Sequence, residues 1–345
     1  MTQAPILSWE KITLKLRNPF RLSYGVSETR QAFWLRLAGD AGWGEGTIPP
    51  YYGVDDDAMI ACWAAAAQRS DPLPEDAAEI EAWVGTSGPA PARCALELAL
   101  YDRIARQRDL PLWQLLGLPR PEPRPTSFTI AIDTPAAMAK MASELTGFPV
   151  IKIKLGGDAQ DEDRLAAVRA ARPDVRLRID ANAGWTLEQA GEYVRRLAVY
   201  DLEMIEQPLA RDAHAEMGIL QAQTDIPIVA DESVQTLADV ERLAEAGVRG
   251  INVKLMKVGG LTPALRVIHY AREHGMQVML GCMIETSIGT SAMAHLMGLA
   301  EWFDLDAPML ISNDPFDGIT YGEDAAIHLP DRPGIGTLLR TVPVK

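Results

Sequence analysis

Six charged residues recur along this chain of 345 residues at nearly constant intervals. They are Lys154, Asp180, Glu206, Asp231, Lys254 and Asp306. The first five are separated by 26, 26, 25 and 23 residues, and a double interval of 52 residues leads to the sixth. Each of the six ends a short apolar run typical of a β-strand. Three carboxylates flanked by two lysines would suit a divalent metal ion and two proton-transfer groups.

The spacing of this series matches the repeat of a (β/α)8 barrel, in which eight units take about 250 residues. All strands of that fold end at one face, so residues that are distant in sequence converge there. Eight strand-like runs alternate with helical segments between residues 127 and 309. They are SFTIAI, VIKIKL, VRLRID, DLEMIEQ, IPIVAD, GINVKL, QVMLGC and FDLDAPM. No GxGxxG motif follows the first run, which disfavours a dinucleotide-binding sheet. We therefore predict an α/β protein with a (β/α)8-type (modified TIM) barrel.

The chain is longer than a minimal barrel, so about a hundred residues remain for a second module. Alternating strands are predicted within residues 5–48, and helices within residues 55–70, 74–84 and 90–117. In the barrel, the segment TPALRVIHYAREHG is expected to form a helix with Thr262 as N-cap, Pro263 in the first turn and Gly275 at its end. The last residues leave the strand–helix alternation, and we expect them to return to the N-terminal module.

The bulk composition narrows the classes of partner and compartment. A net charge of −14 argues against nucleic acid, whose phosphates require basic patches. Neither a signal peptide nor an apolar run of membrane-spanning length is present, so no membrane partner is expected. Cys62, Cys94 and Cys282 are widely scattered, and we interpret Cys282 as a packed thiol. Together these features predict a cytoplasmic protein.

Asp180, Glu206 and Asp231 are the candidate metal ligands. Their oxygen atoms are hard donors that suit Mg²⁺ or Mn²⁺ better than Zn²⁺. One such residue alone would more often cap the helix that follows its strand. Three at matched positions of consecutive strands favour a metal site.

Lys154 and Lys254 are the candidate acid–base residues. They belong to strands on opposite sides of the predicted barrel, with the three carboxylates between them, so each could reach a substrate carbon from its own face. Lys152 points to the same side as Lys154, and this second cation together with a metal ion would lower the pKa of Lys154. We interpret Lys257 as a loop or surface residue. None of the five histidines ends a strand of the series, so packing or surface roles are expected for His214, His269, His274, His295 and His328.

Several short motifs of this chain resemble the enolase superfamily, in its muconate lactonizing enzyme subgroup. They are KIK (152–154), DAN (180–182), IEQP (205–208), ADES (230–233) and INVKLMKVGG (251–260). The resemblance extends over nearly the whole chain, including GWGEG (42–46) and CALELALYD (94–102). It implies an α+β capping domain at residues 1–125, a barrel at 126–310 and a tail at 311–345 that returns to the cap. It also implies Mg²⁺ as cofactor, with Mn²⁺ as a substitute.

Within that subgroup the chain looks like the dipeptide epimerases. The distinguishing motif is Asp304-Leu305-Asp306, a DxD pattern that in the family holds the α-ammonium group of the substrate. Paired carboxylates suit a cation, although an Asp pair could also cap the last loop. The resemblance implies inversion of the α-carbon of the dipeptide's C-terminal residue by two-base 1,1-proton transfer through an enediolate. Lys154 and Lys254 would serve as the two bases.

The sequence departs from the family pattern in the pocket for the substrate's side chain. Members that act on Ala-Glu carry an arginine in a loop of the cap, and Tyr24 and Gly25 occupy that position here. Arg21 and Arg30 lie nearby in sequence. Ile284 stands where members that act on cationic dipeptides have an acidic residue. A hydrophobic C-terminal residue is therefore a serious alternative to glutamate.

Two other functions remain open. An o-succinylbenzoate synthase or a cycloisomerase could use the same scaffold, but neither reaction needs an ammonium site. A non-catalytic barrel that only binds a metal or ligand is disfavoured because every lysine and carboxylate of the series is present. We expect a small dipeptide as substrate, and a homo-oligomer.

Overall fold

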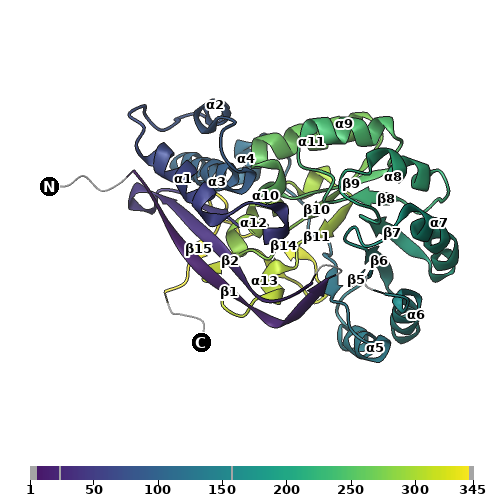
Figure 1. Ribbon diagram of the computed structural model, residues 1–345. Helices are drawn as coiled ribbons and strands as arrows, with labels where there is room; N and C mark the ends of the chain where they lie inside the picture. Colours follow the sequence, from purple (N-terminus) through teal and green to yellow (C-terminus); the bar gives the residue numbers. More distant parts are fainter. Residues whose placement is uncertain (1–5, 23–24, 157, 342–345) are drawn as a thin grey trace.

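An eight-stranded parallel sheet forms the core of the right-hand part of the molecule in Figure 1. The computed structural model describes residues 6–22, 25–156 and 158–341. The strands follow one another in sequence order: β4 (Phe128–Ile130), β5 (Val150–Lys154), β6 (Arg176–Asp180), β7 (Leu202–Glu206), β8 (Ile228–Ala230), β9 (Gly250–Val253), β10 (Gln277–Gly281) and β11 (Trp302–Asp304). The backbone N–H of Ser127 donates to the carbonyl oxygen of Phe303 at 3.0 Å, which brings the two ends of the sheet together. The predicted barrel is thus confirmed, and all eight strand-like runs contribute to it.

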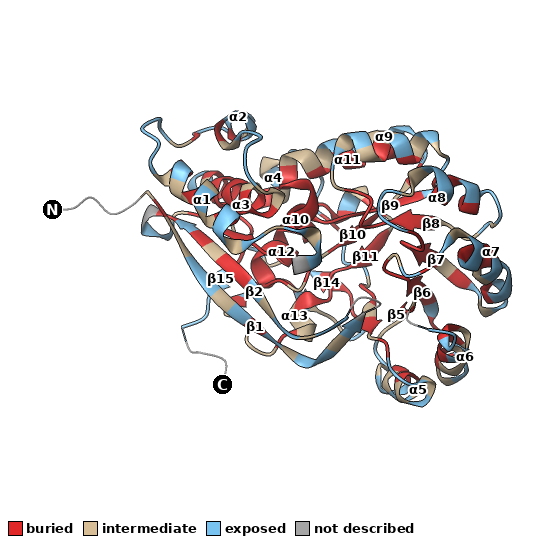
Figure 2. Ribbon diagram, viewed as in Figure 1, coloured by how far each residue is buried: buried red, intermediate tan, exposed pale blue. Residues whose placement is uncertain are grey.

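Helices surround this sheet and bury their apolar sides against it (Figure 2). They are α5 (Pro135–Glu144), α6 (Asp161–Ala171), α7 (Leu187–Arg196), α8 (His214–Gln221), α9 (Leu237–Glu245), α11 (Leu261–Glu273) and α12 (Ser287–Ala294). Short helices follow β9 and β11 and complete the rim: α10 (Leu255–Val258) and α13 (Ala307–Leu310). Single 3-10 turns lie at Leu197–Tyr200 (η4) and Met297–Leu299 (η5). The starts of α7 and α9 carry capping boxes, built on Thr186 and Thr236, which satisfy their first N–H groups.

The N-terminal module is an antiparallel sheet covered by helices. Its strands are β1 (Leu7–Leu22), β2 (Gly25–Leu37) and β3 (Trp43–Gly46), and its helices are α1 (Asp56–Ala67), α2 (Ile80–Val84), α3 (Ala90–Gln107) and α4 (Leu112–Leu115), with 3-10 turns at Ala38–Asp40 (η1), Pro50–Tyr52 (η2) and Ala77–Glu79 (η3). Helix α3 lies directly on β3. A Cβ atom on Gly44 would stand 1.9 Å from the carbonyl oxygen of Ala95, so only glycine permits this approach.

The C-terminal residues pack against the N-terminal module. Strand β12 (Phe316–Asp317) pairs with β15 (Leu338–Leu339), and β13 (Thr320–Tyr321) pairs with β14 (Ile327–His328). The ring of Phe316 lies 5.0 Å from that of Trp34 and 5.2 Å from that of Trp43, both edge-on. The domain boundaries at residues 125/126 and 310/311 stay a prediction.

Two carboxylates of the N-terminal module bind the starts of barrel helices. Glu97 of α3 accepts the backbone N–H of Thr262 in the first turn of α11 at 3.0 Å. Glu45 of β3 accepts the backbone N–H of Thr286 at 2.9 Å and that of Gly289 at 3.2 Å at the start of α12. Burial raises the pKa of each of these two carboxyl groups to about 7. The helix N-terminus favours their charged form.

This arrangement corrects the predicted start of α11. The helix begins at Leu261 with Gly260 in the N-cap position, so the prediction of Thr262 as N-cap was wrong. The side chain of Glu97, from the N-terminal module, caps the helix instead. No pattern in the sequence around the helix predicts such a contact. In the part of the chain that the structure describes, no helix is both long and apolar enough to cross a membrane.

Candidate functional site

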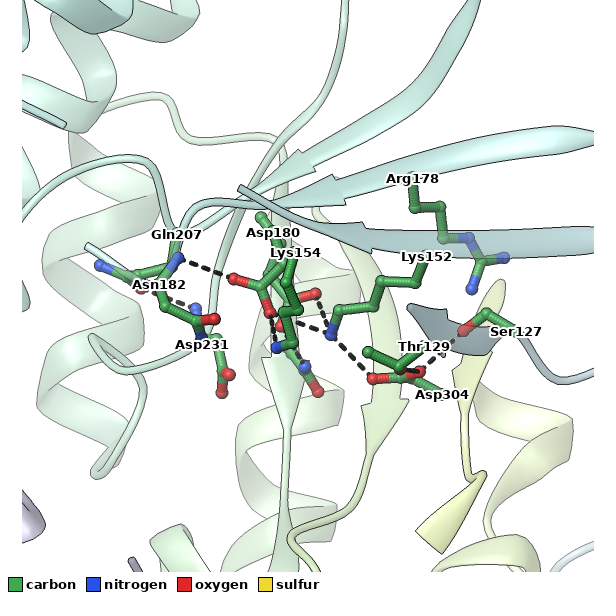
Figure 3. A network of polar contacts seen from close by, with 12 residues as sticks. Ser127, Thr129, Lys152, Lys154, Arg178, Asp180, Asn182, Gln207, Asp231 and Asp304 are labelled. Carbon is green, nitrogen blue, oxygen red and sulfur yellow. Dashed lines mark hydrogen bonds and ion pairs between the residues drawn. The ribbon is translucent and has the colours of Figure 1, made fainter. Parts of the chain in front are cut away.

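Three carboxylates meet at the face where the barrel strands end. Asp180 ends β6, Glu206 ends β7, and Asp231 follows β8 directly; all three are buried. One oxygen atom from each lies within 4.8 Å of the others. Asp180 pairs with Glu206 in the register of β6 and β7, so the two side chains emerge at the same level. The structure therefore brings together the three residues that the spacing singled out, and Figure 3 shows two of them, Asp180 and Asp231.

The three carboxyl groups of this cluster differ in how readily they carry a negative charge. Burial, together with repulsion from Asp180, raises the pKa of Glu206 to about 8. Burial also disfavours charge on Asp180 and Asp231, but neighbouring lysines outweigh that effect and lower the pKa of both. Three hard oxygen donors at this spacing, one of which retains a proton near neutral pH, fit a divalent cation of the Mg²⁺ type.

Lys152 lies inside the site and not at its edge. Its Nζ stands 2.6 Å from Glu206 Oε2, 2.8 Å from Asp304 Oδ2 and 3.1 Å from Asp180 Oδ2. Burial alone would lower the pKa of Lys152, but the carboxylates around it raise that pKa well above its ordinary value. Lys152, held by three carboxylates, is therefore a fixed positive charge within the site.

Lys154 and Lys254 approach the cluster from opposite sides. Lys154 ends β5, and its Nζ lies 2.5 Å from Asp180 Oδ2. Lys254 follows β9, and its Nζ lies 2.7 Å from Asp231 Oδ2. Strands β6, β7 and β8 separate the two, as predicted from the sequence. Burial lowers the pKa of Lys254, but Asp231 outweighs it and raises that pKa well above the usual value.

The prediction that Lys257 is a loop or surface residue was wrong. Its side chain is buried, donates to the carboxylate and the backbone carbonyl of Asp231, and reaches the carbonyl of Asn252 at 3.0 Å. Helix α10 begins immediately after Lys254, so Lys257 turns back under the site. Burial lowers the pKa of Lys257. The neighbours of Lys257 in LMKV are apolar, and this pattern in the sequence could have predicted that the segment is buried.

Two side-chain amides also help to position Glu206 and Asp231. Asn252 Nδ2 donates to Glu206 Oε1 at 2.8 Å, and Gln207 Oε1 accepts the backbone N–H of Asp231 at 2.8 Å. Both residues belong to motifs noted in the sequence, but their positioning roles were not foreseen. Both amides stand at the ends of apolar strands, where a buried polar side chain needs a hydrogen-bond partner, and this pattern could have predicted their positioning roles.

The two aspartates of the DxD motif differ in their surroundings. Asp304 accepts from Lys152 and, at 2.7 Å, from Ser127 Oγ (Figure 3). Burial opposes its charge, but Lys152 lowers its pKa to about 2. Asp306 accepts the backbone N–H of Thr129 at 2.9 Å, and burial with repulsion from Asp304 raises its pKa to about 7. Within the described residues Asp304 forms an ion pair and Asp306 does not, so Asp306 is the better placed for an incoming cation.

A pocket lies between the barrel mouth and the N-terminal module. The module contributes Phe20, Arg30, Pro49 and Tyr51. The barrel contributes Lys152, Lys154, Lys254, Asp304 and Asp306 together with Ile284 and Leu310. Arg21 lines a neighbouring cavity instead, and Tyr24 lies outside the described residues. The module's side of the pocket thus combines one arginine with two aromatic rings and a proline.

The chain is similar in sequence and in structure to several known proteins. The family model "Enolase C-terminal domain-like" matches residues 135–341. The chain is 34% identical over 333 residues to the L-Ala-D/L-Glu epimerase of Bacteroides thetaiotaomicron, which covers 94% of this chain and 85% of that protein. It is 35% identical over 346 residues to the hydrophobic dipeptide epimerase of Roseobacter litoralis, covering 96% and 98% of the two chains. Among solved structures, the dipeptide epimerase of Cytophaga hutchinsonii, in complex with Mg and D-Ala-L-Val, superimposes with a TM-score of 0.89. It is 28% identical and covers 98% of this chain and 99% of its own.

Proposed function

The chain belongs to the enolase superfamily, within its dipeptide epimerases, and from this premise we propose that it inverts the α-carbon of the C-terminal residue of a dipeptide in a Mg²⁺-dependent reaction. One observation carries the proposal. Lys154 and Lys254 stand on opposite sides of a three-carboxylate cluster, and Asp306 lies on the wall of the same pocket. Inversion requires a proton to leave one face of a carbon and another to arrive at the opposite face, which two separate lysines provide.

Asp180, Glu206 and Asp231 would hold the metal ion. When bound, Mg²⁺ neutralises the substrate's carboxylate and the negative charge that develops as the α-proton leaves; Mn²⁺ would substitute. The structural neighbour from Cytophaga hutchinsonii contains Mg and a dipeptide, which supports this cofactor. Lys152 adds a permanent positive charge beside the same carboxylates.

The two lysines exchange roles between the two directions of the reaction. Lys154 removes the α-proton of one configuration while Lys254 delivers a proton from the other side, and the opposite configuration reverses the assignment. Asp306, next to Asp304, receives the N-terminal ammonium group of the dipeptide. This anchor and the carboxylate-binding end together fix the α-carbon between the lysines.

The substrate's C-terminal side chain would face Phe20, Arg30, Tyr51 and Ile284. Two relatives of similar identity are named for different substrates, one for Ala-Glu and one for hydrophobic dipeptides, so relatedness does not decide the side chain. The mixed wall favours an apolar residue, with Arg30 able to bind a glutamyl carboxylate. We expect kcat/KM values for Ala-Leu and Ala-Glu within about tenfold of each other and a lower value for Ala-Lys.

Substitution of Arg30 tests this assignment. Arg30→Ala should lower kcat/KM for Ala-Glu by about tenfold or more and leave Ala-Leu nearly unchanged. Arg21→Ala is the matched control, because Arg21 lines the neighbouring cavity. An equal loss for both substrates, or a selective loss in the Arg21 variant, would contradict the role of Arg30.

The reaction itself is tested by incubating the enzyme with Mg²⁺ and a dipeptide library in D₂O. Epimerisation predicts deuterium at the α-carbon of the C-terminal residue and the appearance of the second diastereomer. The double variant Lys154→Ala/Lys254→Ala is the control. If no dipeptide gains deuterium, the proposal is wrong, and synthesis of o-succinylbenzoate or cycloisomerisation on this scaffold becomes the next reaction to assay. A protein that binds Mg²⁺ but converts none of these substrates would be a binding barrel.

Localisation and assembly complete the proposal. Cys62, Cys94 and Cys282 are free thiols, which supports the reducing environment of the cytoplasm. A homo-oligomeric state stays a prediction, to be measured by light scattering.

A further inference from the structure

A second cavity of about 370 Å³ adjoins the catalytic pocket. It lies between the end of β1, the strand β4 with the start of α5, and α13. Its volume is within the range of ligand-binding pockets, about 300–1,000 Å³. The proton-transfer chemistry described above makes no use of this space.

The two cavities share part of their walls. Phe20, Thr129 and Leu310 line both of them, whereas Lys154 and Lys254 line the catalytic pocket alone. The α-carbon that exchanges its proton must therefore remain on the catalytic side of this shared wall. A group attached elsewhere on the substrate can extend across it.

The ammonium site determines which group that is. Asp306 accepts the backbone N–H of Thr129 at 2.9 Å, so a cation bound to Asp306 lies beside the shared wall. In a dipeptide the N-terminal α-carbon is bonded to the ammonium nitrogen, and the side chain begins at the next atom. The side chain of the N-terminal residue thus starts next to Thr129, on the wall that the two cavities share.

The lining of the cavity determines what it accepts. Its inner wall is formed by the buried side chains of Ile130, Ile132 and Met138, with half-buried Met141 beside them. Charged residues of the lining, such as Arg17 and Asp133, are exposed and form its outer rim. Transfer of an apolar side chain from water to such a wall is favourable. The flexible methionine side chains can adapt to side chains of different shapes.

We propose that this cavity is the binding subsite for the side chain of the dipeptide's N-terminal residue, and that it takes a large apolar side chain. The inference rests on the proposed epimerase function. It predicts that the enzyme is not restricted to alanine at the N-terminal position.

A substrate series with the unmodified enzyme gives the first test. The dipeptides Gly-Leu, Ala-Leu, Leu-Leu and Phe-Leu differ only in the side chain that the cavity would receive. We expect kcat/KM for Leu-Leu to equal or exceed that for Ala-Leu, mainly through a lower KM. A value for Leu-Leu about a hundredfold below that for Ala-Leu would overturn the proposal.

A variant that fills the cavity gives the second test. Ala137 on α5 lines the cavity and is partly exposed, so Ala137→Phe should fold and occupy the space. Turnover of Leu-Leu should fall by about tenfold or more, with Ala-Leu within about twofold of the unmodified enzyme. Ala136→Phe is the matched control, because Ala136 is exposed on the same helix and does not line the cavity.

The outcomes separate this inference from the function on which it rests. If the unmodified enzyme exchanges the α-proton of no dipeptide, the epimerase function fails and the subsite fails with it. If Ala-Leu is epimerised but Ala137→Phe affects both substrates equally, only the subsite is wrong. A loss that follows the size of the C-terminal residue, in the pair Ala-Leu and Ala-Ala, would also overturn the assignment. Should Ala137→Phe not fold, the substrate series decides alone.

Discussion

The ammonium group of Lys152 lies 2.8 Å from the carboxylate of Asp304, deep in the barrel mouth. The same ammonium group lies 2.6 Å from Glu206 Oε2, so a single buried cation connects the three-carboxylate cluster with the DxD motif. The two halves of the site are electrostatically coupled for this reason. A change at one half alters the charge balance of the other.

Lys152→Ala should make the protein depend on its metal for stability. Without this cation the buried carboxylates repel one another, so the Tm of the metal-free variant should fall. Mg²⁺ no longer competes with Lys152, and it should therefore raise the Tm of the variant more than that of the unmodified protein. Thermal unfolding with and without Mg²⁺ measures both effects, with exposed Lys140→Ala as control. An identical Mg²⁺-induced shift in all three proteins would contradict the coupling.

Glu206→Gln should abolish activity while the fold persists. The amide keeps the shape of the side chain but removes one charged ligand, so we expect kcat to fall by about a thousandfold and Mg²⁺ affinity to weaken. Circular dichroism and calorimetric titration with Mg²⁺ report the two properties separately. Glu188→Gln, on the exposed side of α7, is the control. Full activity after complete removal of divalent metal would exclude the mechanism.

Lys154→Ala and Lys254→Ala should each stop epimerisation, but each variant should still exchange the α-proton of one configuration of the substrate. Each variant retains one base, on one face of the substrate carbon. In D₂O we expect one variant to exchange the α-proton of the L configuration and the other that of the D configuration. NMR of the two diastereomers follows both reactions. Epimerisation near the normal rate in either variant would show that the two-base assignment is wrong.

His295 should make the stability of the fold depend on pH. The residue follows α12, its Nδ1 accepts the backbone N–H of Trp113, and its Nε2 donates to the carbonyl oxygen of Ile335. Burial lowers its pKa from 6.5 to about 4. Below pH 6.5 the unfolded chain therefore binds a proton that the folded chain takes up only near pH 4.

The stabilisation due to neutral His295 is thus complete above pH 6.5 and is lost as the pH falls towards 4. The loss over this range is on the order of 3 kcal/mol. Urea unfolding at several pH values, compared with His295→Gln, measures it; the exposed His269→Gln is the control. The His295 variant should show a smaller decrease in stability between pH 7 and pH 4. Equal pH dependence in all three proteins would contradict the prediction.

The barrel and its polar series were predictable because they depend on local patterns with a fixed period. All eight strands are short apolar runs, which define the fold, and six of them carry a charged residue of the series at or just beyond the end, which makes the series converge. Lys257 was not predictable in the same way. Its burial depends on a single turn of helix that begins at Leu255 and directs the side chain back towards Asp231.

Contacts between the N-terminal module and the barrel could not be predicted from the sequence either. Glu97 replaces the expected N-cap of α11, although 165 residues separate it from Thr262. Arg30 and Arg21 looked equivalent in sequence, but they line different cavities, since Arg21 lies on β1 opposite Val26 and Arg30 lies on β2 opposite Leu14. Such relationships arise from the packing of whole modules, and no short stretch of sequence contains them.

Glu45 and Glu97 attach the N-terminal module to the barrel through β3 and α3, and neither attachment uses the end of the β1–β2 hairpin. Phe20 and Arg30, which form part of the wall that selects the substrate, therefore belong to a different piece of chain from the lysines that move its proton. A segment such as residues 16–30 could be exchanged between relatives as a single cassette, with the lysines and carboxylates left in place. Substitutions accumulated in that segment during evolution would then change the substrate preference while every intermediate protein keeps its catalytic residues.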